Sequence, residues 1–331
     1  MSIPTRFDAF RIHDDDAGYR SGIESVTLED LAPGEVVIKA AYSSVNYKDA
    51  LAGTGKGKIL RRFPLVGGID VAGHVVHSSD PAFREGDAVL ATGSGLSETR
   101  DGGYSQYVRL ESKWTVALPT GLDLREAMVL GTAGFTAGLA LLRMLENRQS
   151  PAHGPLAVTG ATGGVGSLAV AIFTRAGFQV HAISGKADQV EYLKALGASE
   201  VLGRDALATA RPMESARFGG GLDNVGGPML ASLLAQTAPC GNVASAGLAA
   251  THELNATVMP FIIRGVSLLG VASAGTARDI RDEVWHRLAG PWKPAHLDRV
   301  CTREVGLDDL PDVFRSMLSG GSLGRTVVRI D

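Results

Sequence analysis

Residues 156–167 read Leu-Ala-Val-Thr-Gly-Ala-Thr-Gly-Gly-Val-Gly-Ser, and this stretch decides the fold. Its first four residues predict a short buried strand, and the apolar run at 168–173 predicts a helix. A glycine-rich turn between them is typical of dinucleotide binding, because glycines let the backbone approach a pyrophosphate and the helix N-terminus carries partial positive charge. We expect Gly163 to allow that approach and Gly166 to let helix and strand pack closely.

The glycine motif is a variant of G-x-G-x-x-G, since Ala161 stands at its first position and Gly160 precedes it. The surrounding sequence strengthens the prediction, because apolar runs alternate with helical stretches from about residue 123 to about 290. This alternation predicts an α/β Rossmann domain, a doubly wound parallel sheet covered by helices. Its strands are expected at 156–159, 179–184, 200–202, 222–225, 242–246 and 266–271. The alternative is a glycine-rich turn that binds nothing.

The first third of the chain follows a different pattern. Residues 23–122 hold short apolar runs separated by Gly, Pro and Asp, which predict an irregular, mostly β region, and the run at 325–330 is similar. A chain of 331 residues favours two domains. We expect residues 1–122 to begin a catalytic domain, 123–295 to bind the dinucleotide, and 296–331 to return to the catalytic domain.

Composition and charge favour a cytoplasmic enzyme with a small-molecule substrate. The formal net charge of -3 gives no broad positive field for nucleic acid or for an anionic membrane surface. Only two cysteines are present, Cys240 and Cys301, which fits a reducing compartment. The N-terminus lacks the apolar core of a secretory signal. Residues 258–274 are apolar but contain Pro260, Arg264 and several glycines, so we expect a buried strand there and not a membrane span.

The end of the second expected strand indicates which cofactor is bound. Ser184, Gly185 and Lys186 lie there, and Ser184 is 21 positions after Gly163. A site selective for NAD places Asp or Glu near this point to bind the ribose 2′-hydroxyl. A hydroxyl, an amide and a lysine can donate to a 2′-phosphate instead, and Arg204 is a second cation. These residues favour NADPH, whereas the alternative for Lys186 is an ordinary solvated lysine.

The sequence holds no recognisable set of zinc ligands. A catalytic zinc needs Cys and His ligands, and a structural zinc needs clustered cysteines. The eight histidines have no partner cysteine in a ligand motif, and His74 lies in Gly-His-Val. We therefore expect no metal site. Without a Lewis acid, hydride transfer is easiest to a carbon activated by conjugation, as in an enoyl thioester, an enone or a quinone.

The segment 43–49, Ser-Ser-Val-Asn-Tyr-Lys-Asp, follows an expected strand and opens a short helix. Such a position suits side chains that project into a cleft between domains. Asn46 and Tyr47 are therefore our candidate catalytic residues, which would orient the substrate or the nicotinamide. A helix N-cap and a packed tyrosine are the alternatives.

Six sequence blocks in order resemble one known group of proteins. They lie at 44–49, 68–73, 102–105, 131–137, 159–166 and 260–266. In these blocks the chain resembles the acryloyl-CoA reductase branch, also called YhdH-like quinone oxidoreductases, of the zinc-free medium-chain dehydrogenase/reductase superfamily.

The resemblance implies a GroES-like catalytic domain beside the Rossmann domain, a homodimer, and NADPH-dependent reduction of acryloyl-CoA to propanoyl-CoA. It implies cofactor contacts from Tyr47, Thr162, Gly163, Gly164, Val165, Ser184, Gly185, Lys186, Arg204, Leu248 and Ser273. Lys186 stands where the group usually has arginine, which keeps the charge but loses the bidentate fork and so predicts a weaker preference for NADPH.

A CoA thioester carries several phosphates, so its site should present cations. The loop at 53–62 offers four, Lys56, Lys58, Arg61 and Arg62, which are our candidates for binding the CoA phosphates. The alternative is a merely solvated loop. Two other functions stay open at this point: an NADPH-dependent quinone or enone reductase, and a non-catalytic NADPH-binding protein of the zeta-crystallin type.

Overall fold

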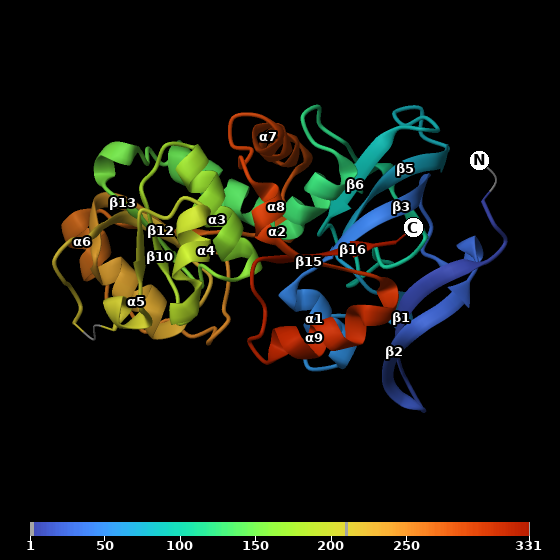
Figure 1. The fold of residues 1–331 in the computed structure, drawn as a ribbon, viewed down its shortest axis with the longest axis horizontal. Helices are drawn as coiled ribbons and strands as arrows, with labels where there is room; N and C mark the ends of the chain where they lie inside the picture. The colour runs from blue at the N-terminus through green and yellow to red at the C-terminus, as the bar shows by residue number, and fades with distance from the viewer. Residues whose placement is uncertain (1–2, 209–210, 331) are drawn as a thin grey trace. The chain divides into compact units, whose positions relative to one another are not determined.

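The structure is a computed structural model that describes residues 3–208 and 211–330. The chain forms two compact units, each drawn in Figure 1. The first contains the chain up to Thr132, the short stretch Ala274–Glu283 and the chain from Cys301 onward. The second contains Ala133–Ser273 and Val284–Val300. The first unit therefore consists of three separate stretches of sequence.

The second unit is built on a parallel sheet in the order β11-β10-β9-β12-β13-β14. Its strands are β9 (Leu156–Thr159), β10 (Val180–Ile183), β11 (Glu200–Leu202), β12 (Phe218–Asp223), β13 (Thr237–Ser245) and β14 (Ser267–Gly270). The chain winds outward from β9 to one side and then from β12 to the other. The predicted doubly wound sheet is confirmed, and β9 and β12 flank its switch point, where such sheets bind ligands.

The second unit also contains helices. They are α3 (Gly164–Arg175), α4 (Val190–Ala195), α5 (Gly227–Ala235), α6 (Met259–Arg264) and α8 (Leu297–Val300). Helix α3 is apolar on most sides because it is packed inside the unit, with every residue from Gly166 to Phe173 buried.

One prediction for this unit is wrong. Residues 258–274 are not one buried strand, because Pro260 lies in the first turn of helix α6 and Gly265, with φ 61°, ends the helix in the left-handed conformation. Ile262 and Ile263 are 77% and 62% exposed. Only β14, at the edge of the sheet, is a strand in this stretch.

The first unit is mostly β, with a sheet in the order β15-β16-β3-β5-β6-β8 and β7 also paired with β3. A second sheet has the order β2-β1-β4. The strands are β1 (Phe7–Asp15), β2 (Gly18–Val26), β3 (Val36–Val45), β4 (Leu65–Val66), β5 (Asp70–Ser78), β6 (Ala88–Thr92), β7 (Tyr107–Leu110), β8 (Val116–Ala117), β15 (Cys301–Val305) and β16 (Arg325–Arg329). Strand β16 pairs antiparallel with β3, which is how the end of the chain joins this unit.

Two helices of the first unit pack closely against each other. They are α1 (Tyr47–Thr54) and α9 (Leu310–Leu318), which lie side by side in Figure 1. A Cβ at Gly53 would lie 2.3 Å from the Phe314 ring, so only glycine permits this approach. The contact fixes the helix that carries Tyr47.

Helices α2 (Leu124–Glu146) and α7 (Arg278–Ala289) each contribute residues to both units. Helix α2 is long and apolar enough to cross a membrane, but 83% of its most apolar stretch is buried inside the fold. It is also kinked at Gly131, where φ is 49° and ψ is -156°. These properties are those of a core helix.

Candidate functional site

The glycine-rich turn forms a tight bend between β9 and α3. The Gly163 amide donates to the Gly160 carbonyl at 2.9 Å, and the Ser167 hydroxyl donates to the Ala161 carbonyl at 3.1 Å. A Cβ at Gly166 would lie 2.2 Å from the Gly160 oxygen, so Gly166 is required for packing, as its place in the motif predicts.

This turn fits the diphosphate of a dinucleotide. The first amides of α3, from Gly164 onward, have no acceptor within the helix, and the helix dipole adds partial positive charge there. Neither Gly163 nor Gly164 has a side chain to hold a ligand away. A Cβ at Gly163 would meet only the Gly160 oxygen, at 3.3 Å, so this position is open toward a bound group.

The residues expected to bind a 2′-phosphate lie together at the ends of β10 and β11. The Ser184 hydroxyl accepts from the Lys186 amide at 3.0 Å and lies 3.5 Å from the Thr162 hydroxyl. A Cβ at Gly185 would lie 2.5 Å from Nε of Arg204, so the guanidinium rests against the glycine backbone. The structure thus brings the Ser184 hydroxyl, the Lys186 backbone and the Arg204 guanidinium together, with Ser184 next to Thr162 of the turn that follows β9.

Leu248 and Ser273 lie on loops after the neighbouring strands β13 and β14. Leu248 is 65% exposed, and its backbone lies near Gly226. Ser273 accepts a hydrogen bond from the Thr136 hydroxyl at 2.9 Å. Because carboxyl ends of parallel strands share one edge of the sheet, both loops lie along the same edge as the glycine-rich turn.

A polar network at the switch point was not predicted from the sequence. The Thr159 hydroxyl donates to Asp223 at 2.7 Å and accepts from the Asn224 amide at 3.0 Å, while the Asn224 side chain donates to the Thr159 carbonyl at 2.8 Å. Burial raises the pKa of Asp223. We expected a strand over 222–225, but β12 ends at Asp223, so these polar residues stand at the open edge and hold the start of the turn.

In the first unit, Asn46 and Tyr47 lie at the start of helix α1. The Asn46 amide group donates to Asp70 at 2.7 Å and to Asp49 at 3.2 Å, and its carbonyl oxygen accepts from Arg325 at 3.1 Å. Both polar atoms of the Asn46 side chain are thus hydrogen-bonded within the first unit. Tyr47 is 51% exposed, and its hydroxyl bonds to no described residue.

Asp70 is the centre of a buried polar cluster behind these two residues. It accepts hydrogen bonds from the hydroxyls of Ser44 and Thr132, both at 2.6 Å, and lies 3.8 Å from the Arg325 guanidinium. A Cβ at Gly131 would meet Asp70, Ser44 and Arg325 within 2.9 Å, which explains glycine at the kink of α2. The sequence analysis missed Asp70 and Arg325, although charged residues inside apolar strands are the signal that could have revealed them.

Asp49 adds a second carboxyl group to this cluster. It accepts from the amides of Asn46 and Ile69 at 2.8 and 3.0 Å. Burial, reinforced by the charge of Asp70, raises the pKa of Asp49 to about 7. The group therefore titrates near neutral pH.

The cation-bearing loop after α1 is exposed. Lys56, Lys58 and Arg61 have their side chains toward solvent, and Arg61 lies 3.9 Å from Glu98, which also pairs with Lys48 at 2.5 Å. Arg62 donates to the Thr99 carbonyl at 3.1 Å.

Comparison with known proteins places this architecture in one family. Residues 32–120 match the alcohol dehydrogenase GroES-like domain, and residues 164–290 match the zinc-binding dehydrogenase domain. YhfP of Bacillus subtilis, which is named as a quinone oxidoreductase, is 46% identical over 93% of this chain and 94% of its own length. The chain belongs to the medium-chain dehydrogenase/reductase superfamily.

Two further relatives define the branch of this superfamily. The acrylyl-CoA reductase AcuI of Ruegeria pomeroyi is 42% identical over 94% of this chain and 95% of its own length. The YhdH oxidoreductase of Salmonella enterica, solved in complex with NADP, has a TM-score of 0.95 and 42% identity, covering 98% of this chain and 100% of that one. The expected resemblance, and the Rossmann and GroES-like folds that it implies, are confirmed.

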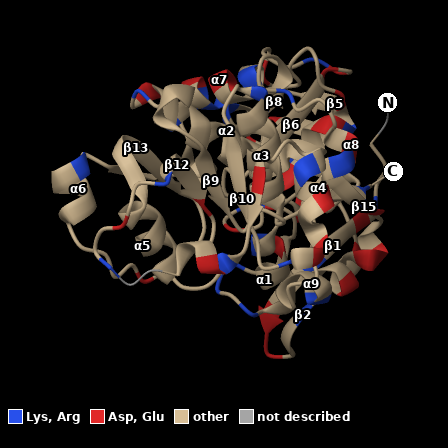
Figure 2. Cartoon of the chain, turned by 60° about the vertical axis from the view of Figure 1, so that its left-hand side comes forward, with Lys and Arg blue, Asp and Glu red and all other residues tan. Residues whose placement is uncertain are grey.

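The domain matched at residues 164–290 is described as a zinc-binding dehydrogenase domain, so the side chains that could bind zinc matter here. Among residues 3–208 and 211–330, no three His, Cys, Asp or Glu side chains come together as a metal site would require. His74 lies exposed on β5. Figure 2 shows acidic and basic residues interspersed along the elements of each unit.

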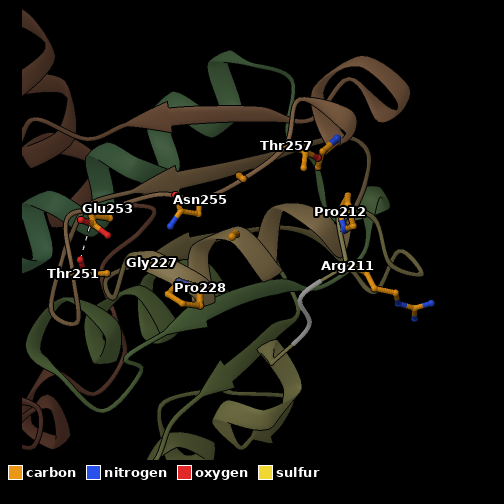
Figure 3. A pocket seen from close by; sticks show the side chains of 11 residues that line it. Arg211, Pro212, Gly227, Pro228, Thr251, Glu253, Asn255 and Thr257 are labelled. Carbon is orange, nitrogen blue, oxygen red and sulfur yellow. Dashed lines mark hydrogen bonds between the residues drawn. The ribbon is translucent and has the colours of Figure 1, made fainter.

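The second unit of this reductase-like chain also contains a pocket of about 500 Å³ beside helices α5 and α6. Figure 3 shows Thr251, Glu253 and Asn255 on one side of it and Pro228 on the other, while the Arg211 side chain points away. It shares no lining residue with the glycine-rich turn or with Ser184, Lys186 and Arg204. The pocket therefore does not include the turn, although its residue Thr251 and the predicted cofactor contact Leu248 both lie next to Gly226.

Proposed function

We propose that this chain is an NADPH-dependent oxidoreductase that reduces the conjugated C=C bond of an enoyl-CoA, with acryloyl-CoA to propanoyl-CoA as its reaction. The observation that carries the proposal is the grouping of Ser184, Lys186 and Arg204 beside an open glycine-rich turn. This grouping provides donors for both the diphosphate and the 2′-phosphate of NADPH. The name of the Ruegeria relative supports the substrate.

The choice of NADPH is supported by one relative and qualified by another. The Salmonella YhdH was solved with NADP, whereas the Bacillus YhfP was solved with NAD. Lys186 provides one positive charge without the planar fork of an arginine. We therefore propose a preference for NADPH that Lys186 and Arg204 produce together.

NADPH held by the turn at 160–166 would supply a hydride to the β-carbon of the substrate, and a proton taken up from water at the α-carbon would complete the reduction. Residues of the chain would then orient the substrate and the nicotinamide. Tyr47 presents an exposed hydroxyl from the first turn of α1, and we assign to it a hydrogen bond to nicotinamide or substrate. Asn46 acts through Tyr47, because its own side chain is held by Asp70, Asp49 and Arg325.

Leu248, Ser273 and the residues of the turn complete the proposed cofactor contacts. Thr162, Gly163, Gly164 and Val165 bind the diphosphate, and Leu248 and Ser273 lie on the two loops farther along the same edge. We propose that no zinc takes part, since the described residues provide no cluster of zinc ligands. In this scheme the residues 123–295 bind the cofactor, and 1–122 with 296–331 bind the substrate.

We also propose that the enzyme works in the cytoplasm as a homodimer. Cys240 and Cys301 are free thiols, as a reducing compartment favours. Strand β14 leaves one edge of the sheet unpaired within the described chain. Helix α6, which packs against the neighbouring β13, and its N-cap expose Val258, Met259, Ile262 and Ile263. An open edge with an apolar neighbour is a surface that a second copy can cover symmetrically.

A quinone is the second candidate substrate, because YhfP is named as a quinone oxidoreductase. NADPH oxidation by the purified chain, followed by its absorbance, separates the possibilities. Faster turnover with acryloyl-CoA than with a simple quinone supports the proposal, and turnover with quinone alone favours the second candidate. Binding of NADPH without turnover of either substrate would leave a non-catalytic protein of the zeta-crystallin type.

A further inference from the structure

A small pocket in the first unit carries three arginines. It measures about 310 Å³ and is lined by Ala32, Pro33, Arg62, Thr99, Arg100, Arg109, Leu110 and Glu111. We propose that Arg62, Arg100 and Arg109 form a phosphate-binding subsite that takes the nucleotide end of a CoA thioester. This inference rests on the proposed function and assigns Arg100 and Arg109 a role that the sequence did not indicate.

One nitrogen of each guanidinium donates to the protein, and other N–H groups of the same guanidinium remain available. Nε of Arg62 donates to the Thr99 carbonyl at 3.1 Å, Nη1 of Arg100 to Glu111 at 2.8 Å, and Nε of Arg109 to the Gly34 carbonyl at 3.0 Å. Nη1 of Arg62, Nη2 of Arg100 and both Nη atoms of Arg109 bond to no described residue. Guanidiniums that are anchored and still have free donors are suited to phosphate oxygens.

The carboxylates near these arginines are already engaged. Glu111 pairs with Lys113 as well as with Arg100. Asp101 accepts from the Ala32 and Val66 amides at 2.7 and 2.9 Å and lies 3.6 Å from Arg62. Three arginines therefore face one lining carboxylate, which leaves the pocket with a positive charge.

The pocket is held rigidly, so little order must be gained on binding. A Cβ at Gly34 would lie 2.3 Å from the Leu110 carbonyl carbon, which locks the loop at 32–34 onto β7. The Arg100 guanidinium lies 5.2 Å from the centre of the Trp114 ring. Its Nε is buried and has no partner in the described part of the chain, which a bound anion would change.

A chain of contacts joins this pocket to the helix of Tyr47. Lys48, the next residue of α1, pairs with Glu98, and Glu98 is followed directly by Thr99 and Arg100 of the pocket. The Arg61 amide donates to the Glu98 carbonyl at 2.8 Å, which places Arg62 on the same path. A thioester whose acyl group lies at Tyr47 could extend its nucleotide phosphates along these residues.

The test uses the double variant Arg100→Gln/Arg109→Gln and two substrates. Acryloyl-CoA carries the nucleotide, and acryloyl-pantetheine lacks it. The variant should raise the KM for acryloyl-CoA at least about tenfold, as expected for lost charge-assisted hydrogen bonds, and leave the KM for acryloyl-pantetheine and both kcat values unchanged. Arg84→Gln, an exposed arginine outside the pocket, is the matched control.

Calorimetry with adenosine 3′,5′-bisphosphate provides an independent readout. Saturating NADPH is present, so that the probe cannot occupy the cofactor site. The wild type should bind the probe, and the double variant should not. No binding to the wild type, or an unchanged KM for acryloyl-CoA in the variant, would overturn the inference, as would an equal rise of KM for both thioesters with a lower melting temperature.

The two proposals fail in different ways. If the wild type turned over neither thioester, the proposed function would fall, and the assignment of the subsite to a substrate would fall with it. Probe binding that the double variant abolishes, combined with no effect on either KM, would instead assign the pocket to a free phosphate-bearing ligand and overturn its role in substrate binding.

Discussion

Asp70 and Arg325 form an ion pair that is shielded from solvent, with Oδ2 and Nη2 3.8 Å apart and exposed fractions of 0% and 2%. Arg325 also donates to the Val129 and Val45 carbonyls at 3.1 and 2.9 Å, so one side chain connects α2, β3 and β16. Because Asn46 bonds to both members of the pair, the ion pair positions the start of α1.

Replacing Arg325 by methionine should lower the free energy of unfolding by about 3–5 kcal/mol, because Asp70 would stay buried without its counter-charge. Arg329→Met is the control, since Arg329 is exposed on the same strand, and it should change stability by less than about 0.5 kcal/mol. Urea unfolding of both variants measures the difference. Similar stabilities of the two would contradict the assigned role of the pair.

Asp49 predicts a pH dependence of stability. Its pKa is raised to about 7 by burial and by Asp70, whereas an unfolded aspartate has a pKa near 4. Between these values the native state binds more protons than the unfolded state, so the contribution of Asp49 to stability falls as pH rises from about 4 to about 7. Asp49→Asn should remove this slope. Urea unfolding at about pH 5 and about pH 8 measures how the free energy of unfolding depends on pH. The same pH dependence in wild type and variant would refute the prediction.

Two glycines of the turn should respond differently to valine. Gly166→Val places a Cβ 2.2 Å from the Gly160 oxygen and should prevent stable folding. Gly163 has φ -78°, which valine adopts, and its Cβ would meet only one atom, at 3.3 Å. Gly163→Val should therefore fold with a near-normal melting temperature and lose NADPH affinity by at least about tenfold. Retained affinity in the folded Gly163 variant would contradict the diphosphate assignment.

The dimer proposal predicts an effect of charge on α6. This helix carries Arg264 in its last turn and exposes Ile262 and Ile263. Ile262→Lys/Ile263→Lys should convert a dimer to a monomer in sedimentation velocity, because two buried lysines would face the partner without counter-charges. Ile23→Lys, at a residue 38% exposed on β2, should stay dimeric. A monomeric wild type would end the proposal.

Local sequence patterns predicted the sheet of the second unit well. They did not predict residues whose roles depend on long-range contacts. Periodicity located β9, β10, β11 and β14 nearly at their observed bounds, but it placed only the last residues of β12 and the second half of β13. The prediction of a buried strand at 258–274 was wrong because an exposed apolar helix and a buried strand have similar composition. Asp70 and Arg325 were missed because their partners lie up to 281 positions apart, which no local pattern shows.

The cation pocket illustrates the same limit. Arg62 was a candidate because it stands in a basic run, whereas Arg100 and Arg109 are isolated cations in the sequence. Folding of β7 and of the loops at 32–34 and 99–101 brings the three together. Asn46 was correctly placed at a helix start, but only the contacts with Arg325 and Asp70 indicate that it acts by positioning Tyr47.

We propose that the turn at 160–166 binds a dinucleotide whose 2′-phosphate is held by Ser184, Lys186 and Arg204. Fluorescence titration of the purified chain with NADPH and with NADH, in wild type and Lys186→Glu, tests it most directly. We predict one NADPH site per chain and a loss of affinity in the variant that is at least about tenfold larger for NADPH than for NADH. No saturable binding of either nucleotide, or an equal loss for both in the variant, would contradict the account.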